Sequence, residues 1–280
     1  MALPLPSSLS PSKVTAFKDC ALAFRFSVIE RLPEPPSPYA AKGTLVHRAL
    51  ELLMWQEEPP DRTREAALRK LAVAVPEVLD SDEYRGLCLS EKERSDFVDD
   101  AVSLIDNYFL IEDPNDVRVL GTELRMSAQL GSLRLSGIID RLELDGDELV
   151  VTDYKTGRAP GANFEQSKLG GVHFYAFLCS EVLGRRPDRV QLLHLREPLV
   201  ISTVPSEQSV TALRRQAGAL WSAVVVACDR EDFRPKPGRL CSYCSYRDYC
   251  PAVGGDLALL EASAARAGSV VRTSGPDTRL

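Results

Sequence analysis

Three consecutive stretches of β-type sequence, separated by tight-turn residues, occupy the middle of this chain. Residues 117–124, 133–144 and 148–154 alternate or cluster β-branched residues, and turn signals stand between them at Gly131-Ser132 and Gly146-Asp147. Strands joined by such short turns pair with each other in antiparallel order. The pattern therefore predicts a three-stranded antiparallel meander.

Helical patterns lie on both sides of the meander. Ser10-Pro11 has the form of an N-cap followed by proline at the first helical position, and predicts a helix that carries Cys20. Further helices are expected over 40–55, 61–74 (bounded by Pro59-Pro60 and Pro76), 91–111, 165–183 and 206–228, with short strands near 189–195 and 198–204. This order predicts an α/β fold in which helices flank a core sheet and residues 56–113 form a helical insertion.

Chain length and apolar content limit the class of protein. With 280 residues, 44% of them apolar, one elaborated domain or two unequal domains are expected. No run of about eighteen apolar residues is present, so the sequence predicts no membrane span. The N-terminus lacks a charged region followed by an apolar run, so we expect no secretory signal and a cytoplasmic location. In that reducing compartment, the seven cysteines are expected as thiols or metal ligands rather than disulfides.

The net charge of −6 is unevenly distributed. Residues 51–116 hold 18 acidic and 7 basic side chains, a net charge of −11, which is typical of a solvated helical surface. Residues 1–50 and 230–247 each carry a net charge of +3. Because binding responds to local fields rather than to the sum, this composition is compatible with a polyanionic partner such as DNA.

Two aspartates and a lysine lie at the ends of the second and third predicted strands. Asp140 ends the sequence Gly-Ile-Ile-Asp, and Asp153 and Lys155 stand in Val-Val-Thr-Asp-Tyr-Lys. In a hairpin these carboxylates come side by side, a cation offsets their repulsion, and hard oxygen ligands suit Mg²⁺ or Mn²⁺. Lys155 points to the same strand face as Asp153, where it can orient water or offset charge on a phosphate. A hairpin whose exposed ends merely carry charges is the alternative.

Three further groups favour a metal site over that alternative. Glu123, on the first predicted strand, adds a third carboxylate, and His47 lies on a helix that begins near Gly43. The backbone carbonyl of Tyr154 lies between Asp153 and Lys155 and offers another oxygen ligand.

In order along the chain, these residues resemble the RecB-type branch of the PD-(D/E)XK nuclease superfamily. The resemblance covers about residues 10–252 and rests on the motifs G-T-x-x-H, G-x-x-D and D-Y-K-T-G. It implies a restriction-endonuclease-like core in which Lys155 is the catalytic lysine and Glu123 is an additional acidic catalytic residue. It also implies that Mg²⁺ or Mn²⁺ is held by His47, Asp140, Asp153 and the Tyr154 carbonyl.

One position departs from the pattern of this family. The family usually places a glutamine four residues before a tyrosine on the helix after the lysine strand, and here Tyr175 fits but Gly171 stands at the glutamine position. Gln166 is about two and a half helical turns before Tyr175 and is not an obvious substitute. Tyr175 is expected to contact substrate, with core packing as the alternative.

Cys241, Cys244 and Cys250 form a cluster in a tyrosine-rich segment. A closed four-thiolate site needs one more ligand. Three of the remaining cysteines stand in helical contexts and are expected as buried thiols: Cys88, Cys179 and Cys228. Cys20 is therefore the best candidate for the fourth ligand. On spacing alone, zinc and an iron–sulfur cluster are equally compatible, and chance spacing is a third reading.

One N-terminal and three C-terminal cysteines around a nuclease core resemble the iron–sulfur subgroup of the family, which includes AddB-type nuclease domains and CRISPR-associated adaptation nucleases. This resemblance implies a [4Fe–4S] cluster, with zinc as the alternative. The cluster would tie residues 10–30 to residues 230–252 and bring the two basic segments together, where Arg25 and Lys236 are the expected DNA contacts.

The sequence therefore predicts a metal-dependent DNA nuclease, an exonuclease on single strands or DNA ends, in DNA repair, recombination or CRISPR adaptation. Residues 1–252 are expected to form one domain and residues 253–280 a flexible tail. No G-x-x-x-x-G-K-[ST] motif is present, so a helicase or CRISPR adaptation proteins would be separate partners. The alternatives are a catalytically impaired DNA-binding module and a zinc-stapled structural domain.

Overall fold

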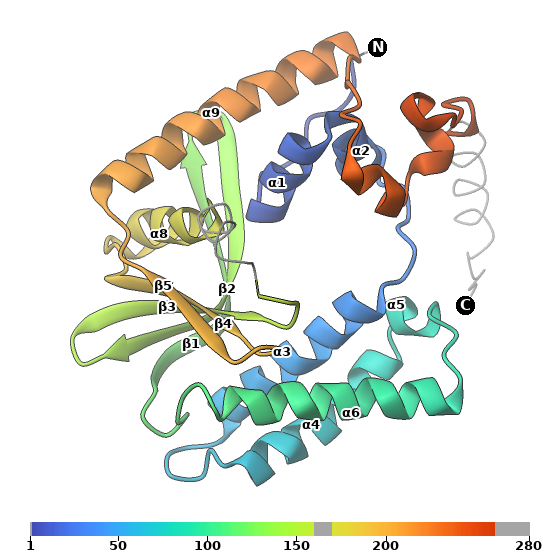
Figure 1. Cartoon of the computed structure of the whole chain (residues 1–280). Helices are drawn as coiled ribbons and strands as arrows, with labels where there is room; N and C mark the ends of the chain where they lie inside the picture. Colours follow the sequence, from blue (N-terminus) through green and yellow to red (C-terminus); the bar gives the residue numbers. More distant parts are fainter. Residues whose placement is uncertain (1, 160–169, 261–280) are drawn as a thin grey trace, which may run out of the picture. The chain divides into compact units, whose positions relative to one another are not determined.

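The computed structural model describes residues 2–159 and 170–260, and these residues form two compact units (Figure 1). The first unit combines residues 2–6, 12–34 and 223–260. The second combines residues 7–11 with the described part of 35–222. The single domain expected over residues 1–252 stays a prediction.

A five-stranded mixed sheet forms the centre of the second unit, in the order β1-β2-β3-β4-β5. The first three strands pair antiparallel, which confirms the predicted meander and the α/β fold class. The strands are β1 (Arg118–Leu130), β2 (Leu133–Asp145), β3 (Glu148–Lys155), β4 (Arg189–His194) and β5 (Leu199–Thr203). Gly131 and Gly146 adopt positive φ angles in the two turns, as the tight connections require.

Strand β3 is the buried centre of the sheet, since its six residues between Glu148 and Lys155 are all buried. It pairs parallel with β4, and the connection between them contains α8 (Gly170–Leu183). A strand that has a parallel neighbour and is covered on both faces favours a continuous run of buried residues over alternation of buried and exposed residues. Residues 160–169 lie outside the described residues, and they include Gln166 and the first part of the predicted helix 165–183.

Helix α3 (Pro38–Gln56) confirms the second predicted helix and starts two residues earlier. Ser37 is its N-cap, accepting a hydrogen bond from the Ala40 amide, and Pro38 occupies the first position. Its apolar side packs against β1 and β2 and shares one hydrophobic core with the helical insertion. This core includes Leu45, Ala49, Leu53, Tyr154, Leu193 and Leu195.

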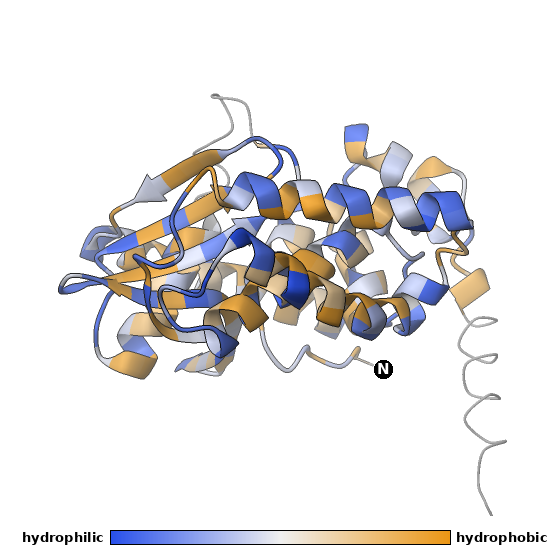
Figure 2. Ribbon diagram, turned by 90° about the horizontal axis from the view of Figure 1, so that it is seen from below, coloured by the Kyte–Doolittle hydropathy of each residue, from blue (hydrophilic) through white to orange (hydrophobic). Residues whose placement is uncertain are grey.

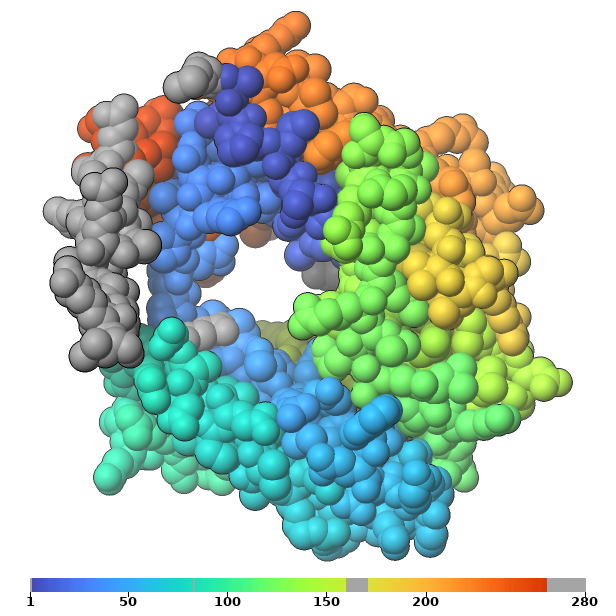
Figure 3. Space-filling model, turned by 180° about the vertical axis from the view of Figure 1, so that it is seen from behind, coloured from blue at the N-terminus to red at the C-terminus, as the bar shows by residue number. Residues whose placement is uncertain are grey.

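Three helices form the predicted insertion: α4 (Arg64–Leu79), α5 (Asp82–Arg85) and α6 (Glu91–Tyr108). The polar and apolar residues that alternate along the helices are visible in Figure 2, and Figure 3 shows the surface of the insertion in cyan to teal. Helix α4 continues through Pro76, so the helix end predicted there is wrong. Burial of Ala74 and Val78 on either side of this proline favours a further turn over an end.

The first unit differs from its predicted structure at Cys20. Helix α1 (Pro11–Asp19) ends before this residue, which has an extended backbone and precedes α2 (Ala21–Phe24) and the π-helical turn η1 (Arg25–Ile29). In the sequence, Phe17, Ala21 and Phe24 keep helical spacing across the break, so the pattern alone concealed it. Cys20 therefore stands at a helix junction rather than within a helix.

The remainder of the first unit comes from the end of α9 (Glu207–Arg230) and the C-terminal segment. This segment folds into three short 3₁₀ turns, η2 (Arg239–Tyr243), η3 (Arg247–Tyr249) and η4 (Pro251–Val253). Residues 261–280, most of the predicted tail, lie outside the described residues. Within the described ranges, no helix combines the length and hydrophobicity of a membrane span.

Two of the three cysteines predicted as buried thiols are confirmed. Cys179 and Cys228 are buried, but Cys88 is exposed, with a φ of 52° after the short helix α5. The predicted helical context of Cys88 is wrong because α5 ends at Arg85.

Helix α6 begins with a capping box that provides a test of the insertion. The Ser90 hydroxyl accepts from the Glu93 amide, and the Glu93 carboxylate accepts from the Ser90 amide at 2.8 Å. Ser90→Ala removes one of these bonds and is expected to lower the free energy of unfolding by about 1 kcal/mol. Denaturant unfolding measures this difference, with Ser95→Ala, also exposed on α6 but away from its N-cap, as the control. Equal stability of the two variants would contradict a role for the capping box.

Candidate metal and catalytic site

Three side chains from three different elements of the second unit meet at one point. His47 of α3, Glu123 of β1 and Asp140 of β2 place one ligand atom each within 4.8 Å of one another. All three are half-buried. Imidazole nitrogen and two carboxylate oxygens form a donor set that a divalent cation can bind.

A local irregularity in the β1–β2 pair brings the two carboxylates into this position. Thr122 pairs with Arg141 and Leu124 pairs with Ile139, so Glu123 and Asp140 lie across from each other between these pairs. Glu123 has a φ of 48°, a left-handed conformation that is rare for a residue with a long side chain. Such departures from strand geometry are concentrated at functional sites, where the surrounding structure offsets their cost.

The backbone of Tyr154 connects His47 with Asp140. Its amide donates to Asp140 Oδ2 at 2.8 Å, and its carbonyl lies 3.1 Å from His47 Nε2. His47 Nδ1 is 3.5 Å from Asp140 Oδ2. The structure therefore brings the Tyr154 carbonyl close to the histidine and the first aspartate.

Two glycines explain how close these elements come. A Cβ atom on Gly43, one helical turn before His47, would lie 3.2 Å from Thr156 Oγ1. A Cβ atom on Gly137, three residues before Asp140, would lie 3.0 Å from the Leu178 side chain of α8. The glycines of the G-T-x-x-H and G-x-x-D motifs thus allow α3 and α8 to pack tightly beside the site.

Asp153 and Lys155 adjoin this cluster on β3. Asp153 is buried, and its Oδ1 accepts a hydrogen bond from the Tyr175 hydroxyl at 3.0 Å. Its Oδ2 accepts no hydrogen bond from the described residues and forms an ion pair with the half-exposed Lys155 ammonium. Tyr175 therefore holds a site carboxylate in place, a role that the sequence did not predict for it.

Burial and like charge perturb the ionisation of the cluster. Burial, and then the nearby Asp153 carboxylate, raises the pKa of Asp140 to about 7. Burial and Asp140 also raise the pKa of Glu123, and burial lowers the pKa of His47. A neutral imidazole is the form that binds metal, and crowded carboxylates gain stability from a cation, so the residues present fit a divalent metal ion.

Sequence reasoning missed a buried polar group behind this site. Arg141 directly follows Asp140, and its side chain is fully buried against Glu112 and Glu143. The available signal was an arginine in the apolar run Gly-Ile-Ile-Asp-Arg-Leu, where a charged side chain on a central strand needs a partner.

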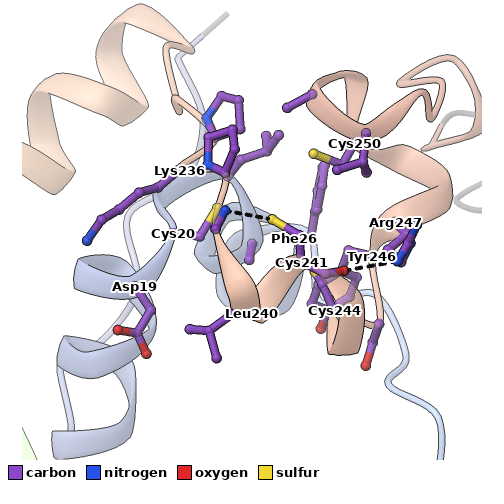
Figure 4. Close-up of a pocket in the computed structure, with 18 of the residues that line it drawn as sticks. Asp19, Cys20, Phe26, Lys236, Leu240, Cys241, Cys244, Tyr246, Arg247 and Cys250 are labelled. Carbon is purple, nitrogen blue, oxygen red and sulfur yellow. Dashed lines mark hydrogen bonds between the residues drawn. The ribbon is translucent and has the colours of Figure 1, made fainter.

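The four predicted cluster ligands lie together in the first unit. Cys20, from the junction of α1 and α2, lines a pocket of about 470 Å³ with Cys241, Cys244 and Cys250 of the C-terminal segment (Figure 4). All four thiols are half-buried and none forms a disulfide. Cys241 Sγ lies 3.3 Å from the Gly238 amide, which points at the sulfur as amides do toward thiolates.

The two predicted DNA contacts also belong to the first unit. Lys236 lines the cysteine pocket, and its ammonium donates to the Lys18 carbonyl at 3.0 Å. Arg25 forms an ion pair with Glu30 at 2.9 Å and does not line that pocket. At the predicted family glutamine position, a side chain on Gly171 would meet no atom within 4 Å among the described residues.

The raised pKa of Asp140 predicts a pH-dependent stability of the metal-free protein. The folded state binds the Asp140 proton more tightly than the unfolded chain, so the stability present below about pH 4 declines as the pH rises through about 7. Asp140→Asn stays neutral and is expected to melt a few degrees above the unsubstituted protein above pH 7 in EDTA. Thermal unfolding against pH measures this, with exposed Asp147→Asn as the control. A constant difference across the pH range would contradict the assignment.

Comparison with known proteins gives a family for the chain. One similar solved structure is a crystal structure of a "Putative exonuclease" from Eubacterium rectale, which has 11% sequence identity to this chain and a TM-score of 0.49. The match covers 85% of this chain and 87% of the exonuclease chain. A second is the crystal structure of SSO0001, with 14% sequence identity and a TM-score of 0.36, and this match covers 75% of this chain and 84% of the SSO0001 chain. No curated protein matches the chain. The model of the PD-(D/E)XK nuclease superfamily matches residues 8–251, and the chain therefore belongs to this superfamily.

Proposed function

We propose that this protein is a divalent-metal-dependent DNA nuclease that acts on single strands or DNA ends. The observation that carries the proposal is the meeting of His47, Glu123 and Asp140, with the Tyr154 carbonyl, beside the Asp153–Lys155 pair. A metal-binding donor set next to a lysine is what phosphodiester hydrolysis requires. We further propose that the protein belongs to the RecB-type branch, because its motifs occur in the order of that branch.

The residues of the site have separate tasks in this reaction. Mg²⁺ or Mn²⁺ would be held by His47, Glu123 and Asp140, and it would polarise the phosphate and make bound water easier to deprotonate. Lys155, half-exposed at the end of β3, orients the attacking water or offsets charge that develops on the phosphate. Tyr175 fixes the rotamer of Asp153, whose other oxygen faces Lys155 and is available as a further metal ligand.

The second part of the proposal is a [4Fe–4S] cluster held by Cys20, Cys241, Cys244 and Cys250. In support, all four line one pocket. Zinc and a cubane cluster both bind four thiolates, and the resemblance of one N-terminal and three C-terminal cysteines to the iron–sulfur subgroup favours the cubane cluster.

The cluster would act as a staple for the first unit, whose residues come from both ends of the chain. Lys236, at the edge of the cysteine pocket, and Arg25 are proposed contacts to the DNA backbone. The proposed pathways are DNA repair, recombination or CRISPR adaptation, with a helicase or CRISPR adaptation proteins as partners.

A catalytically impaired DNA-binding module is the second candidate function. The observation in its favour is Gly171, which supplies no side chain where the family usually has a glutamine. The paired Asp153 and Lys155 and the intact cluster of His47, Glu123 and Asp140 favour catalysis.

Lys155→Ala is expected to reduce Mg²⁺-dependent cleavage at least about 100-fold, because no other group replaces its charge at the phosphate. The assay follows 5′- and 3′-labelled single- and double-stranded oligonucleotides with Mg²⁺, Mn²⁺ or EDTA. Lys92→Ala is the matched control, since this lysine is exposed on α6 and pairs only locally with Asp96. Full cleavage by Lys155→Ala would refute the catalytic assignment, and the absence of cleavage by the unsubstituted protein would favour the binding module.

The cluster has its own test. Protein purified without oxygen is expected to be brown and to contain four iron and four sulfide per chain, in keeping with the proposed [4Fe–4S] composition. Cys250→Ser is expected to lose the colour and most of the iron, whereas Cys88→Ser, an exposed cysteine outside the pocket, retains both. A colourless unsubstituted protein that contains zinc would overturn the iron–sulfur assignment.

A further inference from the structure

Tyr154 connects two chemically different environments within the second unit. Its backbone amide and carbonyl contact Asp140 and His47 in the metal site. Its side chain is buried on the other face of β3, and its phenol oxygen accepts a hydrogen bond from Arg141 at 2.9 Å. One residue therefore joins the metal site to the buried polar group behind it.

That buried group is an extended network centred on the Arg141 guanidinium. Arg141 forms ion pairs with Glu143 and with Glu112, which follows α6 in the insertion. The Tyr108 hydroxyl donates to Glu112 at 2.6 Å. Thr152 and Gln191 complete the network through hydrogen bonds to Glu143 and to each other.

Members of the network alternate with residues of the site along the two central strands. Arg141 directly follows Asp140 on β2, and Thr152 and Tyr154 flank Asp153 on β3. Since neighbouring residues of a strand point to opposite faces, bonds that lock Arg141, Thr152 and Tyr154 also limit the rotation of the strands that bear the two aspartates.

A buried arginine is a costly way to stabilise a core. Removal of its charge from water costs several kcal/mol that the ion pairs only partly offset, so apolar residues of the same volume stabilise a core equally well. A fully bonded polar network instead restricts the core to one geometry. The arrangement here suits geometric control of adjacent groups better than stability.

We propose that the Arg141 network, acting through Tyr154, is a positioning device that sets the geometry of the metal site from the helical insertion. Tyr154, Arg141 and Glu112 are positioning residues, because none of their side chains contributes a ligand atom to the site. The phenol oxygen of Tyr154 bonds to Arg141, and its ring packs edge-on against the His47 imidazole with the ring centroids 5.8 Å apart. This inference deepens the proposed nuclease function and rests on it. Residues that hold metal ligands in place typically change metal affinity or activity by about 10- to 100-fold when altered.

Tyr154→Phe removes only the phenol oxygen and leaves both backbone contacts and the ring. It is expected to weaken Mn²⁺ binding about tenfold and to lower kcat by a similar factor, while KM for an oligonucleotide stays within about twofold. Glu112→Gln, which removes charge at the insertion end of the network, is expected to act in the same direction. Mn²⁺ binding is measured by electron paramagnetic resonance or calorimetry, independently of cleavage.

Tyr84→Phe is the matched control. Tyr84 is a buried tyrosine of the insertion whose hydroxyl has no hydrogen-bond partner among the described residues. This variant is expected to bind Mn²⁺ and to cleave as the unsubstituted protein does. A thermal melt of every variant separates loss of folding from loss of positioning.

Each outcome decides between the two proposals. If the unsubstituted protein neither binds Mn²⁺ nor cleaves DNA, the nuclease proposal fails and this inference fails with it. If it does both, and folded Tyr154→Phe and Glu112→Gln match it in Mn²⁺ affinity and kcat, the inference alone is overturned. Equal losses in Tyr84→Phe would also overturn it, because a general effect of core polarity would then explain the result.

Discussion

Burial of three carboxylates, together with their mutual repulsion, is the constraint on which the arrangement of the site depends. Asp140, Asp153 and Glu123 lie close together and partly away from water, and this raises the pKa of Asp140 to about 7. Neighbouring groups hold them against this repulsion. The Tyr154 amide and Tyr175 hydroxyl bond two of the carboxylates, the Lys155 ammonium pairs with Asp153, and the left-handed backbone at Glu123 presents the third. A divalent cation held by these residues would offset the remaining repulsion.

The Arg141 network lies behind the site and differs from it in how far its charges are compensated. The carboxylates of the site lack full compensation, whereas Arg141 and its partners satisfy one another within the core. The same two strands support both, because alternate residues of β2 and β3 serve one or the other. The helical insertion contributes Tyr108 and Glu112 to the compensated system, so its acidity is not confined to a solvated surface.

Local patterns were sufficient for the sheet, and the residues that they singled out include the three that meet in one cluster: His47, Glu123 and Asp140. Turn glycines and β-branched runs predicted the meander, which by itself places Asp140 near Asp153, and the helix with His47 followed from its apolar spacing. Patterns failed where burial overrode a local signal: α4 passes through Pro76, and the chain bends at Cys20 although its apolar spacing continues. The burial of Arg141 was not predicted either, because its partner Glu112 comes from a distant part of the chain and only the tertiary structure brings the two together.

The sequence by itself determined the strands, the turns and most of the helices, because short-range hydrogen bonding and side-chain periodicity specify them. The order of its motifs indicated the superfamily. The sequence also determined that four cysteines were available as a ligand set. Only the tertiary structure decided which groups share one cluster: Glu123 joins His47 and Asp140, while Asp153 is held by Tyr175 and Lys155. The physical reason is that ligand geometry depends on backbone irregularities and close approaches between distant elements, at Glu123 and at the two motif glycines, which no local pattern encodes.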